Sequence, residues 1–387
     1  MNSIEFIIIL LLLFMAVPDV CRLFDRPALI YPVFVVFGLL LGPWVQPEVA
    51  TMINQAGQIG FLLLLFEVGL EIDLPEPREL VRPVAHVLRW IAIQYPVVLA
   101  LGHFAGLPWL ENFVAAAAIT GCSVGMGYSA WKSYPGLGED AKTFVLRIMV
   151  LLEVLAIVLL AVETTGLGYN AKWWTLALKL IGIGLAVFLC SRIAVPFRRL
   201  LQEIVERATQ WRIHFVTLLV LVVCAVGERL GLSGPKMAFF LGLFMSRVQH
   251  NGKHLEEYLA PISQRFLIPI FFVALGSAIP VSFLWSRTGL LALVSAALLL
   301  AFREMLHRRW LPTGGDAYAF LLYTPNLTMV ALAGSAMLNA GIDPHFAAWV
   351  VLTGLFMTVI AILALPAPRL ESTQSNAAAP ARIDSSS

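Results

Sequence analysis

The chain has very few charged residues for its length. Only 13% of its 387 residues are Asp, Glu, Lys or Arg, whereas about a quarter is usual in a soluble domain. This shortage argues against a soluble fold. Apolar residues make up 59% of the chain instead, and nearly uncharged stretches recur from end to end, close to the roughly 20 residues that a helix needs to cross a bilayer.

The chain also lacks the residue patterns of catalytic, metal and nucleic-acid sites. Its four cysteines are widely scattered, so no pair has metal or redox spacing. His250 and His254 are four residues apart, but without carboxylates or thiols nearby they are weak indicators of a metal site. No nucleophile–base pair, phosphate loop or basic stripe with interleaved aromatics appears. We therefore expect no enzyme activity, no cofactor, no metal centre and no nucleic-acid partner.

Thirteen apolar segments are long enough to suggest membrane-spanning helices, and they predict an all-α polytopic membrane protein. Residues 1–370 would form one transmembrane domain in the lipid bilayer, and the Ser- and Ala-rich stretch 371–387 a disordered cytoplasmic tail. The predicted segments are 4–24, 28–42, 57–70, 83–104, 111–131, 141–162, 173–195, 213–229, 236–248, 265–281, 287–306, 317–340 and 345–366.

The distribution of basic residues predicts the orientation. Nineteen of the 26 Lys and Arg residues lie in loops or tails that a chain of thirteen spans places on one side, and only Lys172, Arg229 and Arg287 on the other. Loops rich in Lys and Arg stay in the cytoplasm. The sequence thus predicts a multi-pass protein of a bacterial-type plasma membrane, with its N-terminus outside and its C-terminus inside.

Two segments read poorly as continuous helices. Residues 120–127 contain three glycines, and residues 324–328 contain a proline among polar side chains. One interpretation is close helix packing at the glycines and a kink at the proline. We favour a second: each interruption lies in the middle span of a three-span group, in 83–162 and in 287–366. Paired interruptions of this kind, in inverted repeats, are typical of the crossed broken helices that form transporter binding sites.

Three ionisable side chains fall at membrane depth, where an unpaired charge is costly. Glu153 follows the first interrupted segment, and a buried carboxylate can hold either a proton or a cation; the alternative is a structural glutamate. Glu67 is a candidate for a proton path or for a brace between two helices. Arg303 is a candidate charge partner of Glu153, although snorkelling to the headgroups is the alternative.

Four short blocks carry a family resemblance. Residues 26–43, which read RPALIYP and then GLLLGP, resemble the opening of sodium/hydrogen exchanger domains in the Kef-type cation:proton antiporter family. Residues 65–71, 240–246 and 269–276 are similar to three later blocks, in the expected order. The resemblance covers about residues 4–366.

The resemblance implies a homodimer that works by an elevator mechanism. Each protomer would have an ion-binding bundle, about 83–162 plus 287–366, and a scaffold and dimer bundle, about 4–70 plus 213–281. The ion-binding bundle would move relative to the scaffold to expose the site alternately.

The resemblance also implies a set of site residues. The ion-binding aspartate of the family corresponds to Glu153, preceded by Leu152 where the family has a polar residue. The polar residues of the first broken helix correspond to Thr120, Cys122 and Ser123. The family's Arg-Gly-Glu element in the second is replaced by Thr324, Pro325 and Asn326, so two charges are missing. Asn326 would keep a hydrogen-bonding role, and Arg303 would supply the balancing charge.

We therefore expect secondary exchange of Na⁺ or K⁺ for H⁺, with Glu153 as the shared ligand. Two alternatives stay open. The altered central charges are compatible with a degenerate protein that acts as a membrane sensor or effector through a partner. The positive helix ends at the crossing are compatible with transport of a small organic anion.

Overall fold

The computed structural model describes ten parts of the chain: residues 3–71, 81–134, 136–163, 212–229, 234–245, 249–250, 253–255, 259, 261–309 and 316–366. The regular elements in these parts are helices, apart from a small hairpin of two strands with two residues each, β1 (Gln249–His250) and β2 (Lys253–His254). The α-helices are α1 (Ser3–Leu23), α2 (Ile30–Leu41), α3 (Pro47–Glu71), α4 (Val81–Phe104), α5 (Trp109–Thr120), α6 (Val124–Ser133), α7 (Glu139–Glu163), α9 (Arg212–Arg229), α10 (Gly234–Met245), α12 (Ile268–Ser277), α13 (Arg287–Arg309), α14 (Leu327–Asn339) and α15 (Pro344–Ala364). Short helical turns are η1 (Pro27–Leu29), η2 (Gly42–Trp44), the π turn η4 (Ser263–Leu267), η5 (Val281–Trp285) and η6 (Ala319–Leu321).

Twelve of the thirteen predicted segments coincide with helices. The remaining segment, 173–195, and the predicted tail, 371–387, lie outside the described residues. Within the described part of the chain, seven helices are long and apolar enough to cross a membrane alone. The other helices are shorter or, like α9, carry too many charged residues, and several of them belong to the interrupted segments.

One predicted boundary is wrong, and the first half of one interrupted segment is less helical than predicted. The third span was placed at 57–70, but α3 begins at Pro47, because proline fits the first turn of a helix and the polar stretch that follows it is helical as well. The segment 317–340 is interrupted as predicted, but its first half is not regular α-helix either: it opens with the short turn η6, and a regular helix begins only at Leu327.

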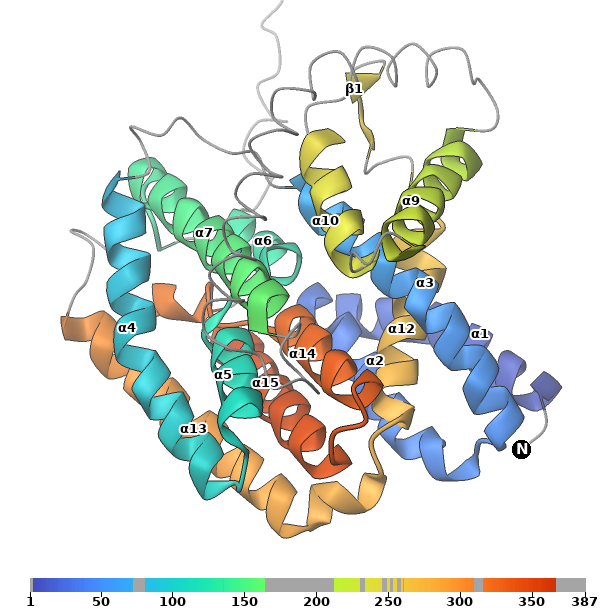
Figure 1. The fold of residues 1–387 in the computed structure, drawn as a ribbon. Coiled ribbons are helices and arrows are strands. Elements are labelled where there is room, and N and C mark those ends of the chain that lie inside the picture. The colour runs from blue at the N-terminus through green and yellow to red at the C-terminus, as the bar shows by residue number, and fades with distance from the viewer. Residues whose placement is uncertain are drawn as a thin grey trace, which may run out of the picture.

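The helices pack in two groups, which lie side by side in Figure 1. In the crossing group, α15 packs on α13 and α14, and α5 packs on α4, α7 and α14; α6 packs on α7. In the flanking group, α3 packs on α10 and α12, α12 on α2, α10 on α9, and α1 on α2. Fewer elements touch across the boundary, among them α12 with α14 and η1 with α6 and α15.

Two glycine pairs bring helices of the flanking group into backbone contact. A Cβ on Gly38 of α2 would lie 2.2 Å from the Val273 oxygen and 3.0 Å from the Gly276 Cα of α12. A Cβ on Gly242 of α10 would lie 2.0 Å from the Phe66 oxygen and 3.0 Å from the Gly69 Cα of α3. Small residues permit such close approach in membranes. Each glycine lies in a sequence block that carries the family resemblance, which gives those blocks a packing role.

Candidate functional site

The two interrupted segments cross and are joined at their breaks. Helix α5 ends at Thr120, the chain runs on through residues 121–123, and α6 begins at Val124. The Ser123 N–H donates to the carbonyl of Pro325, 2.7 Å away, in the break of the second segment. The Ser123 and Thr328 hydroxyls lie 2.8 Å apart. The prediction of two crossed discontinuous helices is therefore confirmed.

The sequence explains why the second segment does not continue as a helix. Pro325 has no N–H, and proline disfavours helical geometry at the residue before it. Asn326 then precedes the first turn of α14, with its carbonyl accepting from the Val330 N–H at 3.0 Å. The backbone groups of this break are bonded by other elements, as buried polar backbone requires.

Glu153 is a residue of α7, and its carboxylate contacts the first residue of the half-helix α6. Its side chain is fully buried, and its Oε2 accepts a hydrogen bond of 3.1 Å from the Val124 N–H. Helix N-termini favour negative charge because their first N–H groups have no helical acceptor and because the positive end of the helix dipole lies there. The second oxygen, Oε1, is equally buried and accepts no hydrogen bond from the residues that the structure describes. One oxygen of the carboxylate is thus hydrogen-bonded, and the other is buried without a donor among the described residues.

Arg303 occupies neither of the two positions considered for it. It is fully buried, which excludes snorkelling. Among the described residues, no hydrogen bond or ion pair joins it to Glu153. Its Nη2 donates to the Ile119 carbonyl at 2.7 Å, its Nη1 to the Thr324 carbonyl at 3.4 Å, and its Nε to the Gln94 Oε1 at 2.8 Å. The reason is local: the Ile119 carbonyl lies in the last turn of α5 and the Thr324 carbonyl lies in the second break, so neither has a helical donor.

Asn326 bonds one of these two carbonyls as well. Its Nδ2 donates to the Ile119 oxygen at 2.8 Å, and its backbone N–H donates to the Thr358 Oγ1 at 3.2 Å. The two predicted threonines are buried at the crossing too, but their hydroxyls turn back on the chain. Thr120 donates to the Ala116 carbonyl at 2.7 Å and Thr324 to the Phe320 carbonyl at 2.6 Å.

The two charges at the crossing therefore contact backbone groups of opposite polarity. The Glu153 carboxylate lies at the N–H of Val124, which opens α6, whereas the Arg303 guanidinium lies at the Ile119 carbonyl near the end of α5 and at the Thr324 carbonyl in the second break. Each charge is stabilised by backbone dipoles of the opposite sign. The carboxylate consequently keeps a free oxygen instead of being neutralised by the guanidinium.

Comparison with known proteins assigns the family. A family model described as the transmembrane sodium/hydrogen exchanger matches residues 8–368. The chain belongs to the sodium/hydrogen exchanger family. It is an integral multi-pass membrane protein.

Several named antiporters are similar to this exchanger. A probable Na⁺/H⁺ antiporter of Methanocaldococcus jannaschii is 24% identical over 76% of this chain and 77% of its own. A high-affinity Na⁺/H⁺ antiporter of Synechocystis is 27% identical over 62% and 52% of the two chains. The glutathione-regulated potassium-efflux protein KefC of Enterobacter is 26% identical over 88% and 57%. The exchanger thus spans little more than half the length of the latter two relatives.

A solved structure shares the fold of the exchanger. The sodium/proton antiporter MjNhaP1 of Methanocaldococcus jannaschii superimposes with a TM-score of 0.67 over 93% of this chain and 95% of that one, at 17% identity. The predicted fold class is confirmed by this agreement.

Glu67 lies in the flanking group of the exchanger, away from the helices that carry Glu153. It is 3% exposed on α3. Its Oε1 accepts from the Ser263 hydroxyl and its Oε2 from the Gln264 Nε2 at 3.2 Å. These contacts join α3 to the π turn η4, as the brace alternative requires. A place for Glu67 in a proton path stays a prediction.

Several residues of the crossing were not predicted from the sequence. Gln94, which bonds Arg303, is a polar side chain in the middle of an apolar span, and that alone is a signal of function. Thr358 bonds the second break, but a threonine in a helix commonly bonds its own backbone and gives no signal. Thr328, which bonds Ser123, lies in the interrupted segment 324–328 but was not singled out as a site residue.

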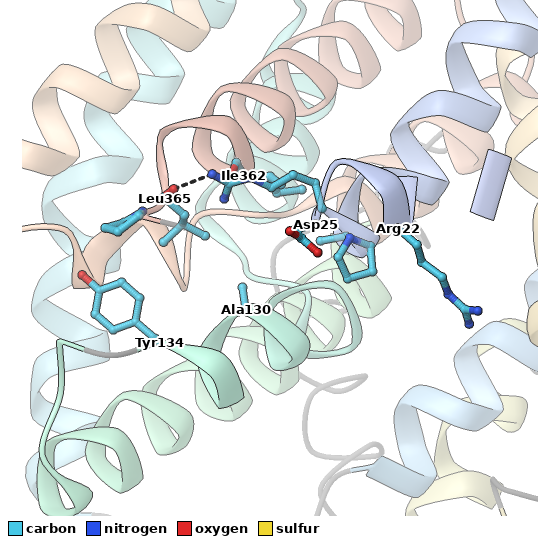
Figure 2. Close-up of a pocket in the computed structure, with 10 residues that line it drawn as sticks. Arg22, Asp25, Ala130, Tyr134, Ile362 and Leu365 are labelled. Atoms are coloured by element: carbon cyan, nitrogen blue, oxygen red, sulfur yellow. Dashed lines mark hydrogen bonds between the residues drawn. The ribbon is translucent and has the colours of Figure 1, made fainter. Parts of the chain in front are cut away.

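A cavity of about 380 Å³ lies where the ends of α1, α6 and α15 meet (Figure 2). Arg26, in the turn after α1, donates to the carbonyls of Ile362 and Leu365 at 2.9 and 2.8 Å. The Asp25 carboxylate and Ala130 of α6 line the same space. The predicted arrangement of spans places all three helix ends on the basic side, and the structure brings them together.

Proposed function

We propose that the protein exchanges a monovalent cation, Na⁺ or K⁺, for H⁺ across the membrane by alternating access, with Glu153 as the shared ligand. The observation that carries this proposal is the divided Glu153 carboxylate: Oε2 is fixed at the start of α6, and Oε1 is buried with no partner among the described residues. Family membership and the names of the relatives support it.

The exchange follows from the cost of burying charge. A lone carboxylate at this depth is unfavourable, so it must be neutralised by a proton or by a cation. Cation binding at Oε1 releases the proton, and protonation releases the cation. Because both ligands use the same oxygen, the two ions compete and are not bound together.

Ser123 and Asn326 are the proposed neighbours of Glu153 in the cation site. Both side chains are buried at the breaks, and Ser123 directly precedes the N–H that holds Glu153. Hydroxyl, amide and carbonyl oxygens replace the hydration shell of an alkali cation. Thr120 and Thr324 have hydroxyls bonded to their own helical turns, so we assign them to the support of the breaks.

The two helix groups would be the moving parts. We propose that the crossing group is the ion-binding bundle and the flanking group the scaffold, in a homodimer with its C-terminus in the cytoplasm. The packing supports this division, since each group has extensive internal contacts. The same division supports an elevator motion.

The two alternatives are less well supported. The organic-anion alternative relies on the positive helix ends at the crossing, and the N–H that opens α6 is already bonded to the Glu153 carboxylate. The Arg303 guanidinium is likewise bonded, to two carbonyls and an amide oxygen. A degenerate effector would not need a buried carboxylate with an open oxygen.

Exchange is tested by dissipation of a pH gradient in proteoliposomes on addition of Na⁺, K⁺ or Li⁺. We expect a cation-dependent response in the wild type, its loss in Glu153→Gln, and no change in Glu139→Gln, which alters an exposed carboxylate on the same helix. A cation response that survives in Glu153→Gln would refute the assignment of Glu153.

A further inference from the structure

We propose that His307 and Tyr323 form a positioning unit, which holds the second break against Arg303 and thereby sets the cation affinity of the site. The inference rests on the exchange proposed above. Neither side chain touches Glu153 in the contacts described, so both would act through the break.

His307 ties two points of the segment before the break to α13. It lies one turn beyond Arg303, on the same face of the helix, and is 2% exposed. Its Nε2 lies 3.0 Å from the Asp316 carbonyl, which can only accept, so Nε2 carries the proton. In a neutral ring Nδ1 is then an acceptor, and it receives the Tyr323 hydroxyl at 2.8 Å.

Tyr323 is clamped from the other side by α4. Its ring, 1% exposed, packs edge-on against Trp90 with the ring centroids 5.1 Å apart. The Trp90 ring in turn faces the Arg303 guanidinium, 5.9 Å from its centroid. Gln94 bonds Arg303 from one turn further along α4. Helices α4 and α13 thus hold the segment between them.

Tyr323 directly precedes the three residues that bond the first interrupted segment and Arg303. Thr324 presents its carbonyl to Arg303, Pro325 accepts from the Ser123 N–H, and Asn326 donates to the Ile119 carbonyl. Apart from the turn η6, this stretch lacks regular helix before Leu327. Its position therefore depends on side-chain anchors, and outer anchors of this kind commonly change metal affinity about 10- to 100-fold when removed.

The test separates the hydrogen bonds from the packing. Tyr323→Phe keeps the ring against Trp90 and removes only the hydroxyl. His307→Asn places an amide near the position of Nδ1 and keeps an acceptor for Tyr323, whereas His307→Gln places it near Nε2 and keeps the bond to Asp316. The exposed residues Tyr318 and His103 provide matched controls, Tyr318→Phe and His103→Gln.

Cation-dependent exchange is measured in proteoliposomes for the full chain, as KM and maximal rate for Na⁺ and K⁺. We expect Tyr323→Phe and His307→Gln each to raise the KM about 10-fold, with little change in maximal rate. His307→Asn should retain most of the affinity, and the controls all of it. The double variant Tyr323→Phe/His307→Gln should be no weaker than either single one, because both remove the same bond.

An unchanged KM in Tyr323→Phe, or independent additive effects in the double variant, would overturn the inference. So would a loss of maximal rate at constant KM, since that indicates a purely structural role. The comparison of His307→Asn with His307→Gln decides the matter if Tyr323→Phe folds poorly. A wild type without any cation response would instead refute the proposed function, which is a different result.

Discussion

Glu153 and Arg303 are both fully buried, yet each is bonded to a different end of the broken helices. The sequence indicated both as candidates, because a charge at membrane depth is costly, with a structural role as the alternative for Glu153 and snorkelling for Arg303. It did not indicate their partners. Apart from the Gln94 amide oxygen, those partners are backbone groups, the Val124 N–H for Glu153 and two carbonyls for Arg303, and they are free to bond side chains only because the helices stop there.

Removing the Arg303 guanidinium should lower the stability of the crossing, but it should leave the hydrogen bond of the Glu153 carboxylate in place. In Arg303→Met the Thr324 carbonyl and the Gln94 amide oxygen lose their donor, whereas Ile119 keeps Asn326. A buried polar group left unsatisfied costs about 1–3 kcal/mol. We expect a clearly lower Tm in detergent for this variant.

The matched control is Arg308→Met on the same helix. Arg308 is exposed and bonds only the exposed Glu304 in the contacts described, and such pairs contribute about 1 kcal/mol at most. Equal Tm values for the two variants would contradict the role given to Arg303.

The elements of this fold were predictable to different degrees. The interruptions were predicted from the glycines of residues 120–127 and from Pro325, because both act on the backbone locally. The irregular stretch before Leu327 and the π turn at Ser263–Leu267 were not. Both depend on partners far away in the sequence, Arg303 and His307 in one case and Glu67 in the other.

The close approach of α3 and α10 should not tolerate a side chain at Gly242. A Cβ there would lie 2.0 Å from the Phe66 carbonyl oxygen, which belongs to the backbone and cannot turn away. Overpacking of this kind costs about 1–3 kcal/mol or more. We expect Gly242→Ala to lower the Tm by several degrees.

Gly138→Ala is the control for this variant, since a Cβ at Gly138 has no atom within 4 Å among the described residues. If Gly242→Ala had the same Tm as the wild type, α3 and α10 would not pack as described.

At the scale of the whole molecule, the contact of Arg26 with the end of α15 links the two helix groups. Its guanidinium reaches from the turn between α1 and η1 to the carbonyls of Ile362 and Leu365. Any sliding of one group past the other must break these two bonds. The contact therefore favours the arrangement of the groups that the structure shows.

Loss of the Arg26 contact should loosen the end of α15. Hydrogen bonds of a charged donor contribute about 1.5–3 kcal/mol, and Arg26→Ala removes both of them. We expect faster hydrogen–deuterium exchange in residues 360–366, measured by mass spectrometry, and unchanged exchange in α13. Arg22→Ala, an exposed position at the same cavity, is the control. Identical protection of α15 in Arg26→Ala and the wild type would show that the contact is not maintained in solution.

The central claim is that one buried carboxylate holds either a proton or a cation. It is tested most directly by proton release when Na⁺ or K⁺ is added to the purified, weakly buffered protein. We expect the wild type and Glu139→Gln to release protons in a saturable manner, and Glu153→Gln to release none above the dilution control. Undiminished release from Glu153→Gln would contradict the account, because the exchanged proton would then reside on another group.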